Sequence, residues 1–345
     1  MNEDYVGRQF VGIDLHRHRS VLVRMTESGE RLGGVRVNND PYAFRSVLED
    51  AGEHPEVVLE ATYGWYWAAD LLAELGAEVH LAHPLGVKGF AYRRVKNDFL
   101  DAADLADLLR MGRLPESWIA PPAVRELREL VRHRAKLVHL CTSLRCQVHA
   151  VLAGQGVTLP VSDLFGVRGA KLLREVQLPA ACRHRVDSLL QLIEAFDREI
   201  AQTAQLTSDR LRDDPGYAAV RTIPGVGPIL GAVFVAEIGD VHRFARPEQL
   251  ASWAGLTPKH YESDKTVHRG RITKQGSRLV RWAAVEAVQH APAGTPMKQV
   301  RDRIVARRGK DARNIATVAA ARELVVLVFY ALRDHHVRRL ATAAA

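Results

Sequence analysis

Hydrophobic and polar residues alternate in short blocks over residues 10–40. The blocks FVGID, SVLVRM and GGVRVNN are rich in β-branched residues, and the polar turns HRHR and ESGE separate them. Short apolar runs bounded by turn residues are typical of strands. Three strands joined by tight turns predict an antiparallel meander at the start of the chain.

Longer blocks follow, up to about residue 111. PYAFRSVLEDAG and WYWAADLLAELG predict helices, whereas EVVLEAT and AEVHLAHP predict buried strands. A helical pattern returns between Val87 and Met111. The resulting order, three strands and then helix, strand, helix, strand, helix, is the order of an α/β domain of the RNase H-like class. We assign residues 1–122 to this domain.

Apolar residues at helical spacing are frequent in residues 123–213. They run from Leu127 to Val148, and a second helical stretch, RVDSLLQLIEAFDREIAQTAQL, follows a segment interrupted by Gly and Pro. Two long helices around a break predict an antiparallel hairpin, here a helical coiled-coil arm. Because such an arm cannot bury its apolar stripe alone, we expect a homodimer or homotetramer.

Residues 214–345 are predicted to form a third, mostly α-helical domain. It begins with TIPGVGPILGAVFVAEIGD, a Pro-Gly-Val-Gly turn that leads into a helix of small residues. The turn resembles the hairpin of a helix-hairpin-helix element, whose backbone amides approach a phosphate. A packing corner between two helices explains the same residues equally well. The polar segment KHYESDKTVHRGRITKQGSRL further on predicts a loop.

Two features argue against a membrane protein. The most apolar stretch, Ile315 to Leu332, carries Arg322 and Glu323 at its middle, so it predicts a buried core helix. The first residues, MNEDYVGRQF, lack the apolar region of a secretory signal. We expect a cytoplasmic protein that associates with the nucleoid.

Charge sets the third domain apart. The chain has a net charge of +8; from Gly216 onward it holds 21 Lys and Arg against 10 Asp and Glu, and before Gly216 it holds 27 against 30. Such an asymmetry favours contact with a polyanion, with a solvated charged face as the alternative. The segment around Ser263 is the main candidate for nucleic-acid binding. Its basic residues are Lys259, Lys265, Arg269, Arg271, Lys274, Arg278 and Arg281.

The first domain carries acids at the ends of two predicted strands and along its last helix. Asp14 ends FVGID and Glu60 ends VVLE, although carboxylates are depleted in strands. Asp98, Asp101 and Asp104 are three apart on the helix, so either adjacent pair can project together. Each acid alone has an ordinary structural explanation. Together they predict a site for hard cations, in which four carboxylates would hold two Mg²⁺ ions that act on a phosphodiester.

Two other candidates have simpler explanations. His16 and His18 resemble a metal-binding pair, but their place in the polar turn HRHR predicts solvated side chains. Ser277, which follows Gly276 in KQGSRL, is typical of a helix N-cap.

These motifs resemble those of a known family. VGIDLHRHRSVLV, LEATYGWYW and KNDFLDA are similar to the three acidic motifs of DEDD transposases of the insertion-sequence one-ten family, described as bridge-RNA-guided recombinases. IPGVGPILGAVFVAEIGD and FARPEQLASWAGLTPKHYESD are similar to its second signature region. The resemblance covers residues 8–115 and 220–290.

The resemblance implies a role for individual residues. Asp14, Glu60, Asp98 and Asp101 would be the catalytic metal ligands, with Asp104 outside the site. Ser263, in the match to the family's Tyr-Glu-Ser, would attack DNA and become covalently linked to it. Because no His/Asp pair beside this serine is evident in the sequence, we expect the metal site to activate it. The expected enzyme is a Mg²⁺-dependent transposase or recombinase that joins the ends of its element to target DNA and uses a guide RNA.

Two other functions fit parts of the pattern. A junction-resolving or other metal-dependent nuclease needs only the carboxylates. A non-catalytic helix-hairpin-helix DNA-binding protein needs only the basic half. A covalent protein–DNA adduct would distinguish the transposase from the nuclease, and metal-dependent activity of any kind would exclude the binding protein.

Overall fold

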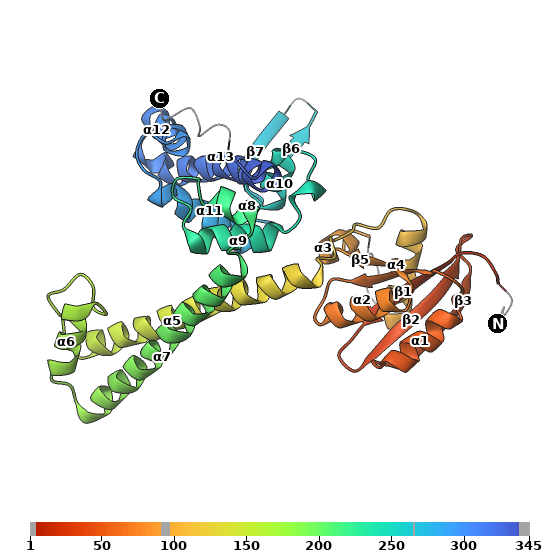
Figure 1. The fold of residues 1–345 in the computed structure, drawn as a ribbon, viewed down its shortest axis with the longest axis horizontal. Helices are drawn as coiled ribbons and strands as arrows, with labels where there is room; N and C mark the ends of the chain where they lie inside the picture. Colours follow the sequence, from red (N-terminus) through yellow and green to blue (C-terminus); the bar gives the residue numbers. More distant parts are fainter. Residues whose placement is uncertain (1–4, 91–96, 265, 338–345) are drawn as a thin grey trace. The chain divides into compact units, whose positions relative to one another are not determined.

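The computed structural model describes residues 5–90, 97–264 and 266–337 of the chain (Figure 1). The chain divides into two compact units, Met1–Ile119 and Ala120–Ala345. The first unit is mixed α/β and the second is mostly helical, as the sequence predicts. The predicted arm and the predicted third domain both belong to the second unit, and their division near residue 213 stays a prediction.

A five-stranded sheet forms the centre of the first unit. Its strands are β1 (Gln9–Leu15), β2 (Arg19–Thr26), β3 (Arg31–Asn38), β4 (Glu56–Glu60) and β5 (Glu78–Ala82). They lie in the order β3-β2-β1-β4-β5. The first three strands pair antiparallel, which confirms the predicted meander. β4 pairs parallel with both β1 and β5, so these three strands end at the same edge of the sheet.

Helices cover both faces of this sheet. They are α1 (Pro41–Glu49), α2 (Trp65–Glu74), α3 (Pro84–Val87) and α4 (Asp98–Arg110). Successive residues of a strand point to opposite faces. Val11 and Ile13 of β1 therefore pack with Leu72 of α2 on one face. Phe10 packs with Ala102 of α4 on the other face.

Gly12 allows α4 to lie directly against β1. A Cβ atom at this position would lie 1.9 Å from the carbonyl oxygen of Ala102 and 2.8 Å from the amide nitrogen of Ala106. Any side chain would have to push the helix away. Asp14 lies two residues beyond Gly12 and so on the same face of β1. The glycine thus brings the helix with Asp98 close to the strand with Asp14.

Two long helices form the arm of the second unit. They are α5 (Pro122–Gly154) and α7 (Ala180–Arg210), and α6 (Val167–Glu175) lies between them in the chain. They run antiparallel, because Arg145 of α5 pairs with Asp197 of α7 at 2.9 Å while Glu126 pairs with Arg210 at 2.6 Å. This is the helical hairpin that the sequence predicts. Near its start, α5 also contributes Leu127 to the core of the C-terminal helices.

Helix α13 lies in the centre of those C-terminal helices. The elements are α8 (Pro215–Val220), α9 (Pro228–Ile238), η1 (Val241–Arg243), α10 (Pro247–Trp253), α11 (Arg278–His290), α12 (Pro296–Arg308), η2 (Lys310–Ala312) and α13 (Arg313–Asp334). The stretch Lys310–Asp334 is long and apolar enough to cross a membrane by composition. However, ten residues of α13, including Leu324 and Phe329, are buried against its neighbours. The predicted core helix is confirmed.

The Pro-Gly-Val-Gly turn between α8 and α9 packs on the end of α11. Gly225 has φ +90°, and a Cβ atom there would lie 2.1 Å from the carbonyl oxygen of Ala287. For this glycine the packing corner is the explanation, and it is not open to a phosphate. Gly227, the N-cap of α9, differs, because a Cβ atom there would meet open space.

The segment around Ser263 is a two-stranded ribbon, so the predicted loop is wrong. β6 (Pro258–Ser263) and β7 (Thr266–Ile272) pair antiparallel. All six residues of β6 are exposed. Strand prediction relies on an apolar face that alternates with a polar one, and a ribbon with no buried face lacks that signal.

Candidate metal centre and nucleophile

Asp14 and Glu60 occupy neighbouring positions at the ends of parallel strands. The register pairs Ile13 of β1 with Leu59 of β4, so the next residues, Asp14 and Glu60, follow side by side. Both acids point to the face that α4 covers, because Val58, two residues before Glu60, packs in the same cluster as α4. The Asp14 side chain is 16% exposed, which is low for a carboxylate.

The acids of α4 lie along one half-exposed side of the helix. Asn97 caps the helix, since its side chain accepts a hydrogen bond from the Phe99 amide at 3.0 Å, and Asp98 is the first helical residue. Asp98, Asp101 and Asp104 are all half-buried, and Ala102 and Ala103, between the last two acids, are buried. The three-residue spacing therefore gives a continuous acidic edge and does not single out one pair.

His16 connects Asp14 to Asp98. Its Nε2 atom lies 3.1 Å from Asp14 Oδ2 and 3.7 Å from Asp98 Oδ2. One potential ligand atom from each of the three residues lies within 4.8 Å of the others. His16 is exposed in the turn, as the sequence predicts, with 42% of its side chain accessible, but its ring also lies beside the two aspartates. The signal that could have found it is its spacing, since residues i and i+2 at a strand end share a face.

The donor set fits a divalent cation. Carboxylate oxygens are the ligands that hard cations prefer, and the imidazole nitrogen of His16 can complete such a site. One of these acids already binds a positive group of the chain: Arg36 Nη2 donates a hydrogen bond to Asp98 Oδ2 at 3.0 Å. Because Asp14 and Asp98 both lie close to the same His16 nitrogen, a bound cation would relieve repulsion between their carboxylates. Within the described residues, Glu60 and Asp101 are not part of this group of three.

Ser263 is the last residue of β6 and is exposed. It pairs with Thr266 across the ribbon, and Tyr261 pairs with His268. Because residues two apart share a face, His268 lies on the same face as Ser263. The sequence alone did not reveal this histidine beside the serine, because a turn separates the two residues. On the opposite face His260 Nε2 lies 3.2 Å from a carboxylate oxygen of Glu262.

Most of the predicted nucleic-acid contacts lie on or next to the ribbon. Lys265 and the side chain of Arg269 lie outside the described residues, although the Arg269 backbone belongs to β7. Arg281 is used within the fold: its Nη1 atom donates to the carbonyl oxygens of Ala254 and Gln275, both at 2.9 Å, and burial lowers its pKa. The exposed members of the set are Lys259, Arg271, Lys274 and Arg278.

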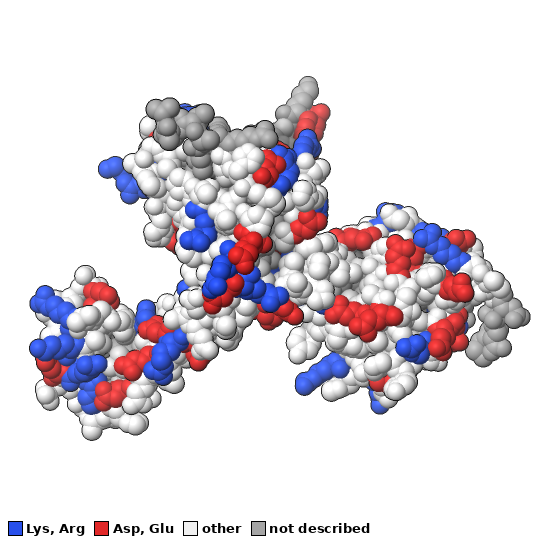
Figure 2. Space-filling model, viewed as in Figure 1, with Lys and Arg blue, Asp and Glu red and all other residues white. Residues whose placement is uncertain are grey.

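Charged side chains gather in different regions of the surface. Figure 2 shows several patches of Asp and Glu on the visible face of the first unit. It also shows Lys and Arg gathered at the end of the arm near α6, a basic region that the sequence analysis did not single out. Its residues in α6 include Arg168, Lys171 and Arg174.

Both units resemble known transposases. A DEDD transposase model of the IS110 group matches residues 11–155. A second model, described as the transposases of the IS116/IS110/IS902 family, matches residues 217–302. The first match contains all four predicted metal ligands, and the second contains Ser263.

Three relatives cover most of the chain. The putative transposase y4qE of Sinorhizobium fredii is 29% identical over 80% of this chain and 70% of its own length. An uncharacterized 44.8 kDa protein of insertion element IS116 from Streptomyces clavuligerus is 27% identical over 98% and 97%. The transposase for insertion sequence element IS1111A of Coxiella burnetii is 24% identical over 93% and 88%. The chain therefore belongs to the IS116/IS110/IS902 family and is an insertion-sequence transposase.

Proposed function

We propose that the chain cuts and exchanges DNA strands at the ends of an insertion sequence and in its target, through a serine–DNA intermediate and with Mg²⁺. The observation that carries the proposal is the placement of Asp14 and Glu60 at neighbouring strand ends, on the sheet face covered by the helix of Asp98 and Asp101. The strand order β3-β2-β1-β4-β5, with an antiparallel meander followed by parallel strands, supports an RNase H-like domain.

The four carboxylates Asp14, Glu60, Asp98 and Asp101 would hold the metal. When bound, two divalent ions activate the attacking oxygen and stabilise the leaving oxygen of a phosphodiester. The chain itself has to keep negative groups close together before DNA arrives. Its strand register places the first two acids together, Gly12 brings α4 close, and His16 connects Asp14 with Asp98.

Ser263 would be the nucleophile. Its Oγ atom forms an ester with a DNA phosphorus and loses its proton, while the bond from phosphorus to the departing strand breaks and that strand's oxygen gains a proton. A hydroxyl of the other DNA then attacks the ester and restores the serine. The exposed end of a ribbon supports this role because a phosphate can reach it from solvent. Lys259 and Arg271 would position the DNA backbone.

We further propose that a structured RNA from the element selects the two DNA molecules, and that the protein works as a homodimer or homotetramer at the nucleoid. The support is the excess of basic residues from Gly216 onward, 21 against 10 acidic ones, which suits more than one polyanion.

The metal site is tested by two substitutions and a matched control. Asp14→Asn and Asp101→Asn should each lower Mg²⁺-dependent strand cleavage by more than about a hundredfold. Removing a residue that only hydrogen-bonds to a metal ligand already lowers activity by up to about a hundredfold, and removing the ligand itself should lower it further. Asp104→Asn, on the same helix, should cleave as the wild type does. Cleavage of labelled element ends and circular dichroism of each variant give the measurement. Near wild-type cleavage by Asp14→Asn would show that the assigned site is wrong.

The serine is tested by the covalent product. Wild-type protein should retain labelled DNA on a denaturing gel, and Ser263→Ala should not. Thr266→Ala removes a hydroxyl from the residue opposite Ser263 in the ribbon and should leave the adduct unchanged. Cleavage without any adduct would favour the metal-dependent nuclease, and DNA binding without cleavage would favour the non-catalytic binding protein.

A further inference from the structure

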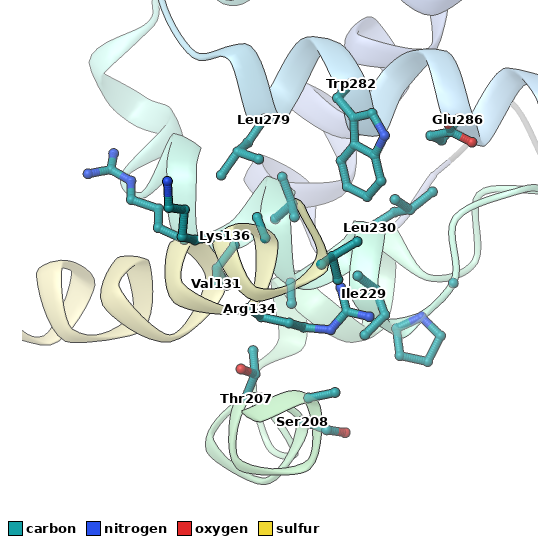
Figure 3. Close-up of a pocket in the computed structure, with 18 of the residues that line it drawn as sticks. Val131, Arg134, Lys136, Thr207, Ser208, Ile229, Leu230, Leu279, Trp282 and Glu286 are labelled. Atoms are coloured by element: carbon teal, nitrogen blue, oxygen red, sulfur yellow. The ribbon is translucent and has the colours of Figure 1, made fainter. Parts of the chain in front are cut away.

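A cavity of about 1,070 Å³ lies inside the second unit, between α5, α9 and α11 (Figure 3). Apolar side chains from all three helices form much of its wall: Val131 from α5, Ile229 and Leu230 from α9, and Leu279 and Trp282 from α11. The carboxylates belong to the other unit, and Ser263 lines a separate depression on the ribbon. The cavity is therefore a different site from the one proposed for catalysis.

Trp282 offers a flat aromatic surface in this cavity. Figure 3 shows its ring extending from α11 toward Leu230. The residue is 42% exposed, whereas Ala283 and Ala284, which follow it, are fully buried. Leaving an indole in contact with water is unfavourable, and a planar ligand that stacks on the ring would remove that contact.

Cations surround the apolar wall without matching acids. Arg134, Lys136 and Arg278 line the cavity, and in the part of the chain that the structure describes none of them has an ion pair or a side-chain hydrogen bond. The acid of the lining, Glu286, pairs with His290 at 3.8 Å. The cavity thus combines an aromatic face with an excess of positive charge.

Arg134 is the cation most in need of an anion. It is half-buried, its Nε atom is hidden from solvent without a hydrogen-bond partner, and burial lowers the pKa of its guanidinium group. Figure 3 shows this group beside Ile229, at the start of α9. Helix N-termini also attract anions, so two positive features meet there. By contrast Arg132, nearby on α5, is neutralised by Glu237 at 2.7 Å.

We propose that this cavity binds one unpaired nucleotide of a nucleic-acid strand. The base stacks on Trp282, its phosphate lies against Arg134, and Lys136 and Arg278 hold the neighbouring phosphates. The three cations of the lining favour a polyanion as the ligand. Among polyanions, a nucleic-acid strand also supplies a planar base that can stack on Trp282, which an acidic peptide lacks. The inference goes beyond strand transfer, because it holds whether or not the carboxylates cleave DNA.

The test is stacking on Trp282, measured by the fluorescence of 2-aminopurine in a short single-stranded oligonucleotide. Stacking on an indole quenches this base, so wild-type full-length protein should quench it. Trp282→Leu should abolish the quenching and lower affinity about tenfold, the effect of one stacked base. Trp282→Phe should restore part of both. Arg134→Gln should lower affinity and flatten its dependence on salt.

Three controls keep the result specific. Trp67→Leu removes an exposed tryptophan of the first unit, and Asp14→Asn removes a predicted metal ligand; both should quench as wild type does. A fully paired duplex that carries 2-aminopurine should show no further loss of fluorescence when the protein is added. RNA and DNA oligonucleotides tested side by side identify which strand is preferred. Undiminished quenching with Trp282→Leu, or a change in sedimentation of this variant instead of a change in quenching, would overturn the proposal, and the second result would assign the cavity to another copy of the chain.

Discussion

His16 lies between two of the predicted metal ligands, with its Nε2 atom 3.1 Å from Asp14 Oδ2 and 3.7 Å from Asp98 Oδ2. A nitrogen ligand changes which cation a carboxylate site prefers. Both Mg²⁺ and Mn²⁺ bind carboxylate oxygens, but Mn²⁺, a first-row transition ion, accepts an imidazole nitrogen more readily than Mg²⁺ does. If His16 is a ligand, the site should therefore accept Mn²⁺ at least as readily as Mg²⁺.

His16→Ala should weaken Mn²⁺ binding by roughly tenfold or more, and Mg²⁺ binding by less, because the lost nitrogen matters more to the softer ion. Calorimetric titration of each metal into the protein without DNA measures both affinities directly. His18→Ala removes an exposed histidine of the same turn and should change neither. Equal losses for the two metals would mean that His16 only positions the aspartates.

For single residues, the sequence identifies the acidic candidates of the site better than it identifies the histidine that contacts them. Asp14 and Glu60 stand out because carboxylates are unusual at the ends of apolar strands. His16 does not stand out, because it begins the polar run HRHR and a turn explains it. Its role depends on Asp98, which is far away in the sequence, and on α4 lying close to β1. Long-range proximity of this kind cannot be derived from local pattern.

At the scale of elements, one glycine determines how close α4 lies to β1. Gly12→Ala should lower the free energy of unfolding by about 3 kcal/mol, at the upper end for overpacked cores, because the new methyl group would overlap the Ala102 carbonyl. Metal affinity should fall with it, since Asp98 moves with the helix. Urea denaturation of the variant gives the first value, and metal titration gives the second.

Gly33→Ala is the matched control for Gly12→Ala. Gly33 lies in β3 of the same sheet, and a Cβ atom there would meet only the end of the Arg24 side chain, at 3.7 Å. It should leave metal affinity unchanged. If Gly12→Ala were equally harmless, the close approach of α4 would not be needed to hold the site together.

Elements with a buried face are predicted well, and the element without one is not. Strands β1, β2 and β4 and the two long helices of the arm have an apolar side, and the sequence indicates them all. The ribbon around Ser263 has no such side, and only its pairing reveals it. The Pro-Gly-Val-Gly turn fits two explanations, and packing of Gly225 on Ala287 favours one of them.

At the scale of the whole molecule, the carboxylates and Ser263 lie in separate compact units. Recombination has to hold two DNA molecules, which favours an assembly of several subunits. We predict that Ser263 of one subunit completes the carboxylate site of another. A mixture of Ser263→Ala and Asp14→Asn subunits, each inactive alone, should then recover part of the cleavage, with DNA joined to the Asp14→Asn chain.

Complementation separates this arrangement from its alternative. If each site is built within one chain, no mixture of these variants contains an intact site, and cleavage stays at zero. Tags of different length on the two variants verify that mixed oligomers form and identify the chain that carries DNA. Zero activity in verified mixed oligomers would exclude the shared site without excluding serine chemistry.

The ribbon that carries Ser263 also has a consequence for the order of events on DNA. A two-stranded hairpin with no buried face is marginally stable in water, so β6 and β7 should open locally at a much lower free energy than α13 in the core. Their backbone amides would exchange with solvent early and become protected only when nucleic acid covers them. Ordering Ser263, the proposed nucleophile, would then be part of substrate binding. The entropic cost of this ordering would disfavour attack on DNA that is bound only transiently.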